Sequence, residues 1–139
     1  MKQARDLGLK QAFYTTGTIT SPVAQELAAG NAEGTIFAYW DADMTNGLAK
    51  AFDDKFKALV GRGPILPLTT HPAYDATNIL LTKVFPAIKG EITSSAVKSG
   101  LLKISNYQGS TGLVTIDKTG AAPIAESAFK LVKGVPTKI

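Results

Sequence analysis

Two pairs of neighbouring carboxylates are the side chains of this sequence whose spacing could support acid or base chemistry. Asp41 and Asp43 follow a strand-like run, where acidic side chains commonly cap the next helix. Asp53 and Asp54 lie on the polar face of a helical pattern, where carboxylates are solvated. General acid and base catalysis needs a group held at the proton that is transferred. Neither pair has such a setting, so both are interpreted as structural or solvated carboxylates.

The remaining candidates for chemistry are equally sparse. His71 is the single histidine, and the Pro72 that follows it favours the first turn of a helix. The chain has no cysteine, which excludes disulfides and thiolate metal sites, and no carboxylate lies at ligand spacing around His71. Neither a phosphate-binding glycine loop nor a G-x-S-x-G motif is present. The sequence therefore predicts a protein that is not an enzyme and that needs no metal or cofactor.

Charge and hydropathy exclude two further classes of partner. Basic residues outnumber acidic ones by 15 to 11, but they are scattered, whereas nucleic-acid binding needs clustered positive charge. We therefore expect no nucleic-acid partner. No apolar stretch reaches the roughly 20 residues of a membrane span, and the first residues do not have the pattern of a signal peptide.

Strands alternate with helices along most of the chain, which predicts an α/β fold. The pattern differs from a complete doubly wound sheet, because the sequence opens in a helix and closes on a hairpin. Tyr74 is expected to pack in the core, and Asp75 is expected to supply charge at a helix N-terminus. The expected elements are helices over 1–7, 21–30, from 47 onward, 72–88 and 93–102, strands over 9–16, 33–40, 107–116 and 124–132, and a loop over 61–70. The apolar stripe Leu48, Phe52, Phe56, Leu59 and Val60 is expected to cover a sheet.

The run YQGSTGLVTIDKTG, residues 107–120, carries glycines at both ends of a strand-like segment. Asp117 and Gly120 favour a type I turn closed by a left-handed residue, which predicts a hairpin with the strand over 124–132. Gly109 and Gly112 permit close backbone approach to neighbouring elements, and Thr111 is expected to form a local hydrogen bond. We favour this packing role over direct ligand contact.

Five segments together resemble one family. These are LGLKQAFYTTGTIT, NAEGTIFAYW, FDDKFKALVGRGP, AYDATNIL and YQGSTGLVTIDKTGAAP. In this order they are similar to the C-terminal part of the extracytoplasmic solute-binding proteins of branched-chain amino acid ABC transporters, the leucine/isoleucine/valine-binding family. Ile116 stands where that family usually has an aromatic residue.

The resemblance implies part of a two-lobed periplasmic binding protein type I fold. Its Rossmann-like lobes are joined by several crossings and close on a ligand. Residues 1–40 are then expected to be the end of the second lobe, and residues 41–117 the C-terminal part of the first lobe. Residues 118–139 are expected to form the hairpin exit and the final crossing to the second lobe.

The resemblance also implies where a ligand would lie. In the family the loop after the first strand of this region faces the cleft and often carries an acidic residue, at a position aligning with Gly17. Here Thr16 and Thr18 offer hydroxyls instead, which suit neutral or anionic groups and supply no charge for an ammonium. Tyr39 and Trp40 could line the cleft near the crossing. The alternatives are a threonine-rich loop without a ligand role and aromatic side chains that belong to the core.

The function implied is that of a solute-binding component, which captures an amino-acid-like or other small polar molecule and delivers it to a membrane permease. The alternatives are a ligand-sensing domain of a regulator or receptor, and a fragment that binds nothing alone. The expected location is periplasmic or extracytoplasmic, with no signal peptide in this chain. The chain is further expected to self-associate or to pair with the missing N-terminal part of the fold.

Overall fold

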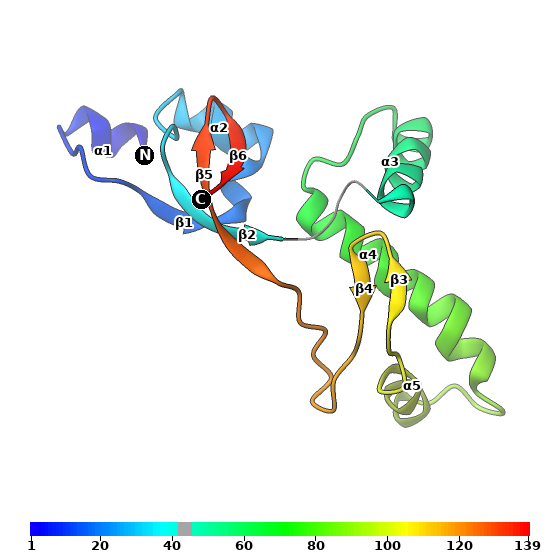
Figure 1. The fold of residues 1–139 in the computed structure, drawn as a ribbon. Helices are drawn as coiled ribbons and strands as arrows, with labels where there is room; N and C mark the ends of the chain where they lie inside the picture. The colour runs from blue at the N-terminus through cyan, green and yellow to red at the C-terminus, as the bar shows by residue number, and fades with distance from the viewer. Residues whose placement is uncertain (42–45) are drawn as a thin grey trace. The chain divides into compact units, whose positions relative to one another are not determined.

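A computed structural model describes residues 1–41 and 46–139, and the chain forms two compact units within it. Unit 1 consists of Met1–Asp41 and Ala125–Ile139, and unit 2 consists of Ala42–Ile124. Each unit combines helices with strands (Figure 1), so the expected α/β class is confirmed. The lobe to which each unit belongs stays a prediction, and Asp43 of the first carboxylate pair lies outside the described residues.

Unit 1 is built on a four-stranded sheet in the order β1-β2-β5-β6. The parallel strands are β1 (Tyr14–Thr16) and β2 (Ile36–Trp40), which the η1 turn (Gly17–Thr20) and α2 (Pro22–Ala28) connect. The strands β5 (Glu126–Val132) and β6 (Val135–Lys138) are antiparallel to their neighbours. A short helix, α1 (Lys2–Asp6), precedes β1.

The helix α2 follows directly from its local sequence. The Ser21 hydroxyl accepts a hydrogen bond from the backbone N–H of Ala24, and Pro22 occupies the first turn, where its missing N–H is not needed. The helix ends at Ala29 and Gly30, which both have left-handed φ angles, of 49° and 81°. The predicted helix over 21–30 is therefore confirmed.

The core of unit 1 lies on one face of the sheet. Phe37 of β2 and Leu131 of β5 are each 2% exposed and pack with residues of η1 and α2. The Phe37 ring stands edge to face with Tyr39, with centroids 5.9 Å apart, and the Phe129 ring also packs on both. Because side chains alternate along a strand, Ile36 and Ala38 lie on the opposite face of the sheet.

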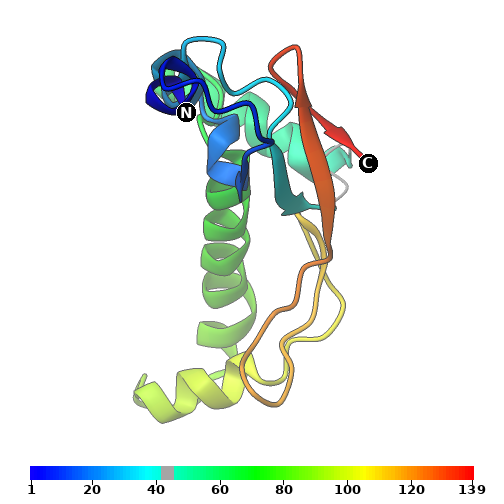
Figure 2. The same ribbon diagram turned by 90° about the vertical axis from the view of Figure 1, so that its left-hand side faces the viewer.

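Unit 2 is mainly helical. It contains α3 (Gly47–Val60) and α4 (Pro67–Ile79), and α4 continues through a π-helical segment η2 (Leu80–Val84) and a 3-10 turn η3 (Phe85–Ala87), a run that Figure 2 shows as one long rod. The remaining elements are α5 (Ser94–Leu101) and a two-stranded hairpin of β3 (Tyr107–Gly109) and β4 (Gly112–Val114).

The predicted loop over 61–70 is partly wrong, because α4 begins at Pro67 and carries Pro72 inside it. Pro67 suits the first helical turn, and the hydroxyls of Thr69 and Thr70 both donate to the carbonyl of Leu66. These local bonds stabilise a helix start that lies five residues before the one predicted.

The apolar stripe of α3 was expected to be covered, and the structure covers little of it. Phe52 is buried and packs on Phe56 and Tyr74, whereas Leu59 is 87% exposed and Leu48 is also exposed. Toward the end of this helical run, Ile79 of α4 and Val84 of η2 are buried, whereas Tyr74, which was expected in the core, is 36% exposed.

The predicted hairpin between 107–116 and 124–132 is wrong. The first strand breaks at Ser110 and Thr111 and folds on itself as β3 and β4, while β5 pairs with β2 and β6. The turn at Asp117 is nevertheless present, because the Gly120 N–H donates to the Asp117 carbonyl at 2.9 Å and Gly120 has a φ of 88°. The turn was therefore predicted correctly, but β4 before it and β5 after it belong to different sheets and do not pair with each other.

Candidate ligand-binding edge

The residues proposed for ligand contact gather at one edge of the unit 1 sheet. Since β1 and β2 are parallel, their carboxyl ends meet at the same edge, and Thr16 lies opposite Ala38 in the register. The loop after Thr16 and the last two residues of β2, Tyr39 and Trp40, therefore lie at neighbouring strand ends. In open α/β sheets this edge is where ligands bind.

The threonine loop presents a pair of hydroxyls to solvent. The Oγ1 atoms of Thr16 and Thr18 are 2.9 Å apart, and both residues are exposed. Gly17 between them is buried, and its carbonyl accepts a hydrogen bond from the Thr20 hydroxyl at 2.8 Å. Two adjacent hydroxyls can each donate to a carboxylate or accept from a neutral donor. Gly17 can contribute backbone groups only.

The two aromatic candidates differ in their surroundings. Tyr39 is half-buried, and its ring is held by Phe37 and by Phe129, whose centroid is 5.6 Å away. Tyr39 therefore packs against the core of unit 1, and its role at a ligand site stays a prediction. Trp40 is also half-buried, and it lies opposite Glu126 at the carboxyl end of β2.

A polar cluster that the sequence did not indicate lies at the same edge. The Asp41 carboxylate accepts hydrogen bonds from the Lys138 ammonium and, at 3.0 Å, from the Ser127 hydroxyl. These hydrogen bonds lower the pKa of Asp41 below its ordinary value of 3.8, the Lys138 bond most strongly. The Asp41 N–H also donates to the Ala125 carbonyl. Asp41 therefore links three strands of unit 1, since it follows β2 and contacts residues of β5 and β6.

The segment after β3 is held by a buried carboxylate in unit 2. Asp75, 3% exposed, accepts hydrogen bonds from the Ser110 N–H (2.7 Å), the Thr111 N–H (2.9 Å) and the Thr111 hydroxyl (2.6 Å). A Cβ on Gly109 would lie 2.5 Å from an Asp75 oxygen, so glycine is required there. The close approach expected at Gly109 is confirmed.

Two expectations about this segment are wrong. Asp75 is not a charge at a helix N-terminus but a buried acceptor, and Thr111 bonds to a residue 36 positions away rather than locally. Gly112 has no close neighbour, and its φ of 100° explains the glycine instead. The cluster is structural, since every contact that it makes binds one part of unit 2 to another.

His71 is a core residue rather than a helix-entry residue. It lies inside α4, is fully buried, and its Nε2 is 3.1 Å from an Asp53 oxygen. Its ring packs edge to face on Phe52 at 4.7 Å, and Nδ1 finds no hydrogen-bond partner among the described residues. No group of three or more metal-binding side chains occurs in residues 1–41 and 46–139.

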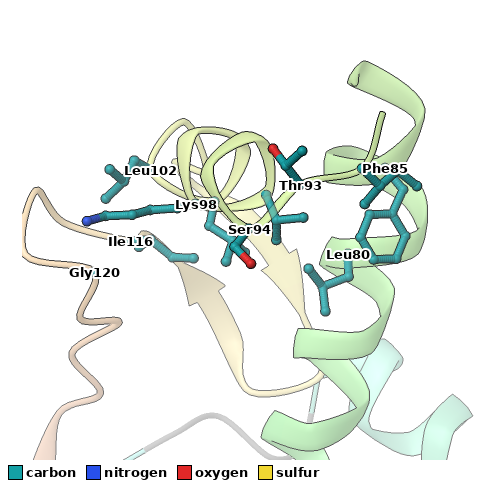
Figure 3. A pocket seen from close by; sticks show the side chains of 11 residues that line it. Leu80, Phe85, Thr93, Ser94, Lys98, Leu102, Ile116 and Gly120 are labelled. Atoms are coloured by element: carbon teal, nitrogen blue, oxygen red, sulfur yellow. The ribbon is translucent and has the colours of Figure 1, made fainter. Parts of the chain in front are cut away.

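Unit 2 also carries a groove of about 500 Å³. Leu80 and Phe85 line one side of it, and Lys98, Leu102 and Ile116 line the other (Figure 3). None of the residues predicted to contact ligand lies in this groove. Across the described parts of the chain, no helix is both long enough and apolar enough to cross a membrane.

Comparison with known proteins places these features in a family. The family model described as periplasmic binding protein matches residues 1–134. A leucine-binding protein, LivK, from Thermotoga maritima is similar in structure, with a TM-score of 0.77 and 24% identity over 99% of this chain. A solute-binding protein of an ABC transporter from R. palustris, in complex with benzoate, has a TM-score of 0.74, 17% identity and 99% coverage.

A periplasmic binding protein type 1 from Bordetella pertussis has a TM-score of 0.78, 19% identity and 99% coverage of this chain. The chain spans 39%, 38% and 42% of the lengths of these three structures, respectively. No curated protein matches the sequence. The α/β architecture is therefore part of the type I fold, and the chain belongs to the periplasmic binding protein family.

Proposed function

We propose that this chain is the part of an ABC transporter solute-binding protein that presents one wall of the ligand site. The observation that carries the proposal is the exposed hydroxyl pair of Thr16 and Thr18 at the carboxyl edge of a parallel strand pair, in a chain of the periplasmic binding protein family. The protein acts outside the cytoplasm and delivers its ligand to a membrane permease.

The ligand proposed is a small polar molecule, amino-acid-like or a simple carboxylate. The segment from Tyr14 to Thr20 has no carboxylate, and Asp41 at the same edge is already bound to Lys138. The groups offered by the loop suit a carboxylate or a neutral polar group better than an ammonium. One structural relative is named for leucine, and another holds benzoate, which has a carboxylate and no ammonium.

The five residues predicted for the site have distinct roles, and only some of them contact the ligand. Thr16 and Thr18 hydrogen-bond to the ligand through their hydroxyls, and Gly17 keeps the turn between them tight. Trp40 offers an apolar surface beside the loop, and Tyr39 supports it from the core. The remaining contacts come from the part of the fold that the structural relatives have and this chain does not cover.

Alanine substitution of the two hydroxyls tests the proposal. Titration calorimetry is done on the chain joined to the remaining part of the fold, with leucine and benzoate as probes. Removing one hydrogen bond of about 1 kcal/mol in Thr16→Ala or Thr18→Ala should weaken binding roughly five-fold, with little change in melting temperature.

Thr137→Ala is the matched control, because Thr137 is an exposed threonine on β6 of the same sheet. It should bind as the unchanged protein does. If both loop variants bind the probe with unchanged affinity, the loop has no ligand role and the proposal is wrong.

A further inference from the structure

The carboxyl end of strand β2 is supported by a neighbouring strand on one side only. The register of β1 with β2 ends where Thr16 lies opposite Ala38. The last two residues of β2, Tyr39 and Trp40, therefore have no partner on β1 in the part of the chain that the structure describes. On the other side β2 continues along β5, where Trp40 lies opposite Glu126. The backbone support of this strand end comes from the β5 side.

Asp41, the residue after Trp40, adds to this support in two ways. Its backbone N–H donates to the Ala125 carbonyl at 2.9 Å, which continues the contact between β2 and β5 by one residue. Its carboxylate accepts hydrogen bonds from the Ser127 hydroxyl of β5 and from the Lys138 ammonium of β6. The end of β2 is thus tied to residues that come 86 and 97 positions later in the chain.

The contacts of Asp41 suit a local role. The hydrogen bonds from Lys138 and Ser127 lower the pKa of Asp41, so its carboxylate is ionised at neutral pH and its charge is balanced by the lysine. A ligand ammonium would have to compete with that lysine for the same oxygens. The side chains of Asp41 and Lys138 are 38% and 55% exposed, and exposed ion pairs contribute little to global stability. They can still hold one strand end in place.

We propose that Asp41 is a positioning residue of the ligand-binding edge. Through its bonds to β5 and β6 it holds the end of β2, and with it Trp40, beside the loop that carries Thr16 and Thr18. A site that is ordered before the ligand arrives binds more tightly, because the ligand does not have to order it. The inference rests on the proposed function, since it adds to that site a residue that acts through Trp40 without touching the ligand.

Trp40 itself provides the first test, because it is the single tryptophan of the sequence and its fluorescence needs no label. Lys138→Met removes the ammonium and leaves the sequence of β2 unchanged. Acrylamide should quench Trp40 of the 139-residue chain more strongly in this variant, because the strand end opens more often. Lys130→Met is the matched control, since Lys130 is an exposed lysine of β5 that has no ion pair among the described residues. It should leave the quenching unchanged.

Ligand affinity provides the second test. Titration calorimetry is done on the chain joined to the remaining part of the fold, with leucine and benzoate as probes. Lys138→Met and Asp41→Asn should each weaken binding about two- to five-fold, with little change in melting temperature. The double variant should bind about as well as either single variant, because all three lack the same ion pair.

Three results would overturn the proposal. The first is equal quenching in Lys138→Met and Lys130→Met, and the second is unchanged affinity in Lys138→Met. The third is an additive loss in the double variant, which would show that one of the two charges contacts the ligand directly. The proposed function fails separately: if Thr16→Ala and Thr18→Ala bind normally while Lys138→Met binds weakly, the threonine loop has no ligand role and the positioning by the ion pair stands.

Discussion

Replacing Asp75 by asparagine should strongly destabilise unit 2. The carboxylate is 3% exposed and accepts three hydrogen bonds, from the Ser110 N–H, the Thr111 N–H and the Thr111 hydroxyl. Asparagine has nearly the same shape, but it keeps one acceptor oxygen and puts an NH2 group in place of the other. If its oxygen faces Ser110, the NH2 group faces the Thr111 N–H and leaves a buried donor unpaired.

The magnitude follows from the bonds that are lost. A hydrogen bond to a charged group contributes about 1.5–3 kcal/mol, and a buried polar group left unpaired costs about 1–3 kcal/mol. Burying a neutral amide instead of a carboxylate offsets part of this loss. The expected decrease in the free energy of unfolding of unit 2 is therefore about 2–4 kcal/mol.

Urea denaturation followed by circular dichroism measures this decrease, with Asp54→Asn as the matched control. Asp54 is an exposed carboxylate on α3 that pairs with Lys50, and exposed pairs of this kind contribute about 0.3–0.5 kcal/mol. A loss below about 1 kcal/mol for Asp75→Asn, or a loss equal to that of the control, would refute the reasoning that Asp75 holds the turn after β3.

Two further predictions concern the same unit. Gly109→Ala should lower the midpoint of urea unfolding, because the new Cβ would lie 2.5 Å from an Asp75 oxygen. Gly63→Ala should have a much smaller effect, because a Cβ there meets nothing within 4 Å. Equal midpoints for the two variants would contradict the close approach at Gly109. Hydrogen bonds from the Thr119 hydroxyl and backbone N–H lower the pKa of Asp117, so the ionised carboxylate stabilises the folded turn. This stabilisation is fully present when the pH is above the ordinary pKa of 3.8, and it decreases progressively as the pH falls below that value. Asp117→Asn should therefore flatten the loss of thermal stability between about pH 5 and pH 2, and an unchanged pH profile would show that the turn does not depend on this charge.

Several elements were predictable because their determinants are local. The α2 helix follows from Ser21 and Pro22 at its start, and the turn at Asp117 follows from hydrogen bonds among residues no more than four positions apart. The family resemblance was also visible in the sequence, because five short segments keep their order even though each alone is weak. The loop with Thr16 and Thr18 was found through that resemblance and not from its own pattern.

The partners of long-range contacts were not predictable in the same way. From the sequence, Asp75 was interpreted as a charge at a helix N-terminus. In the structure its carboxylate accepts hydrogen bonds from the backbone N–H groups of Ser110 and Thr111, which lie 35 and 36 positions later. Asp41 is bound to Lys138, 97 positions away, because β2, β5 and β6 lie side by side.

The sequence by itself determined the local elements and the α/β class of this protein, since helix caps, turns and apolar periodicity act within a few residues. Only the tertiary structure decided that β5 joins β2 and β6 instead of pairing with the strand before the Asp117 turn. The strand β5 alternates in burial along its length, so it can pair with any strand that presents a matching face. Burial of Phe37 and Leu131 against α2 selects one pairing, and that selection depends on residues far apart in the chain.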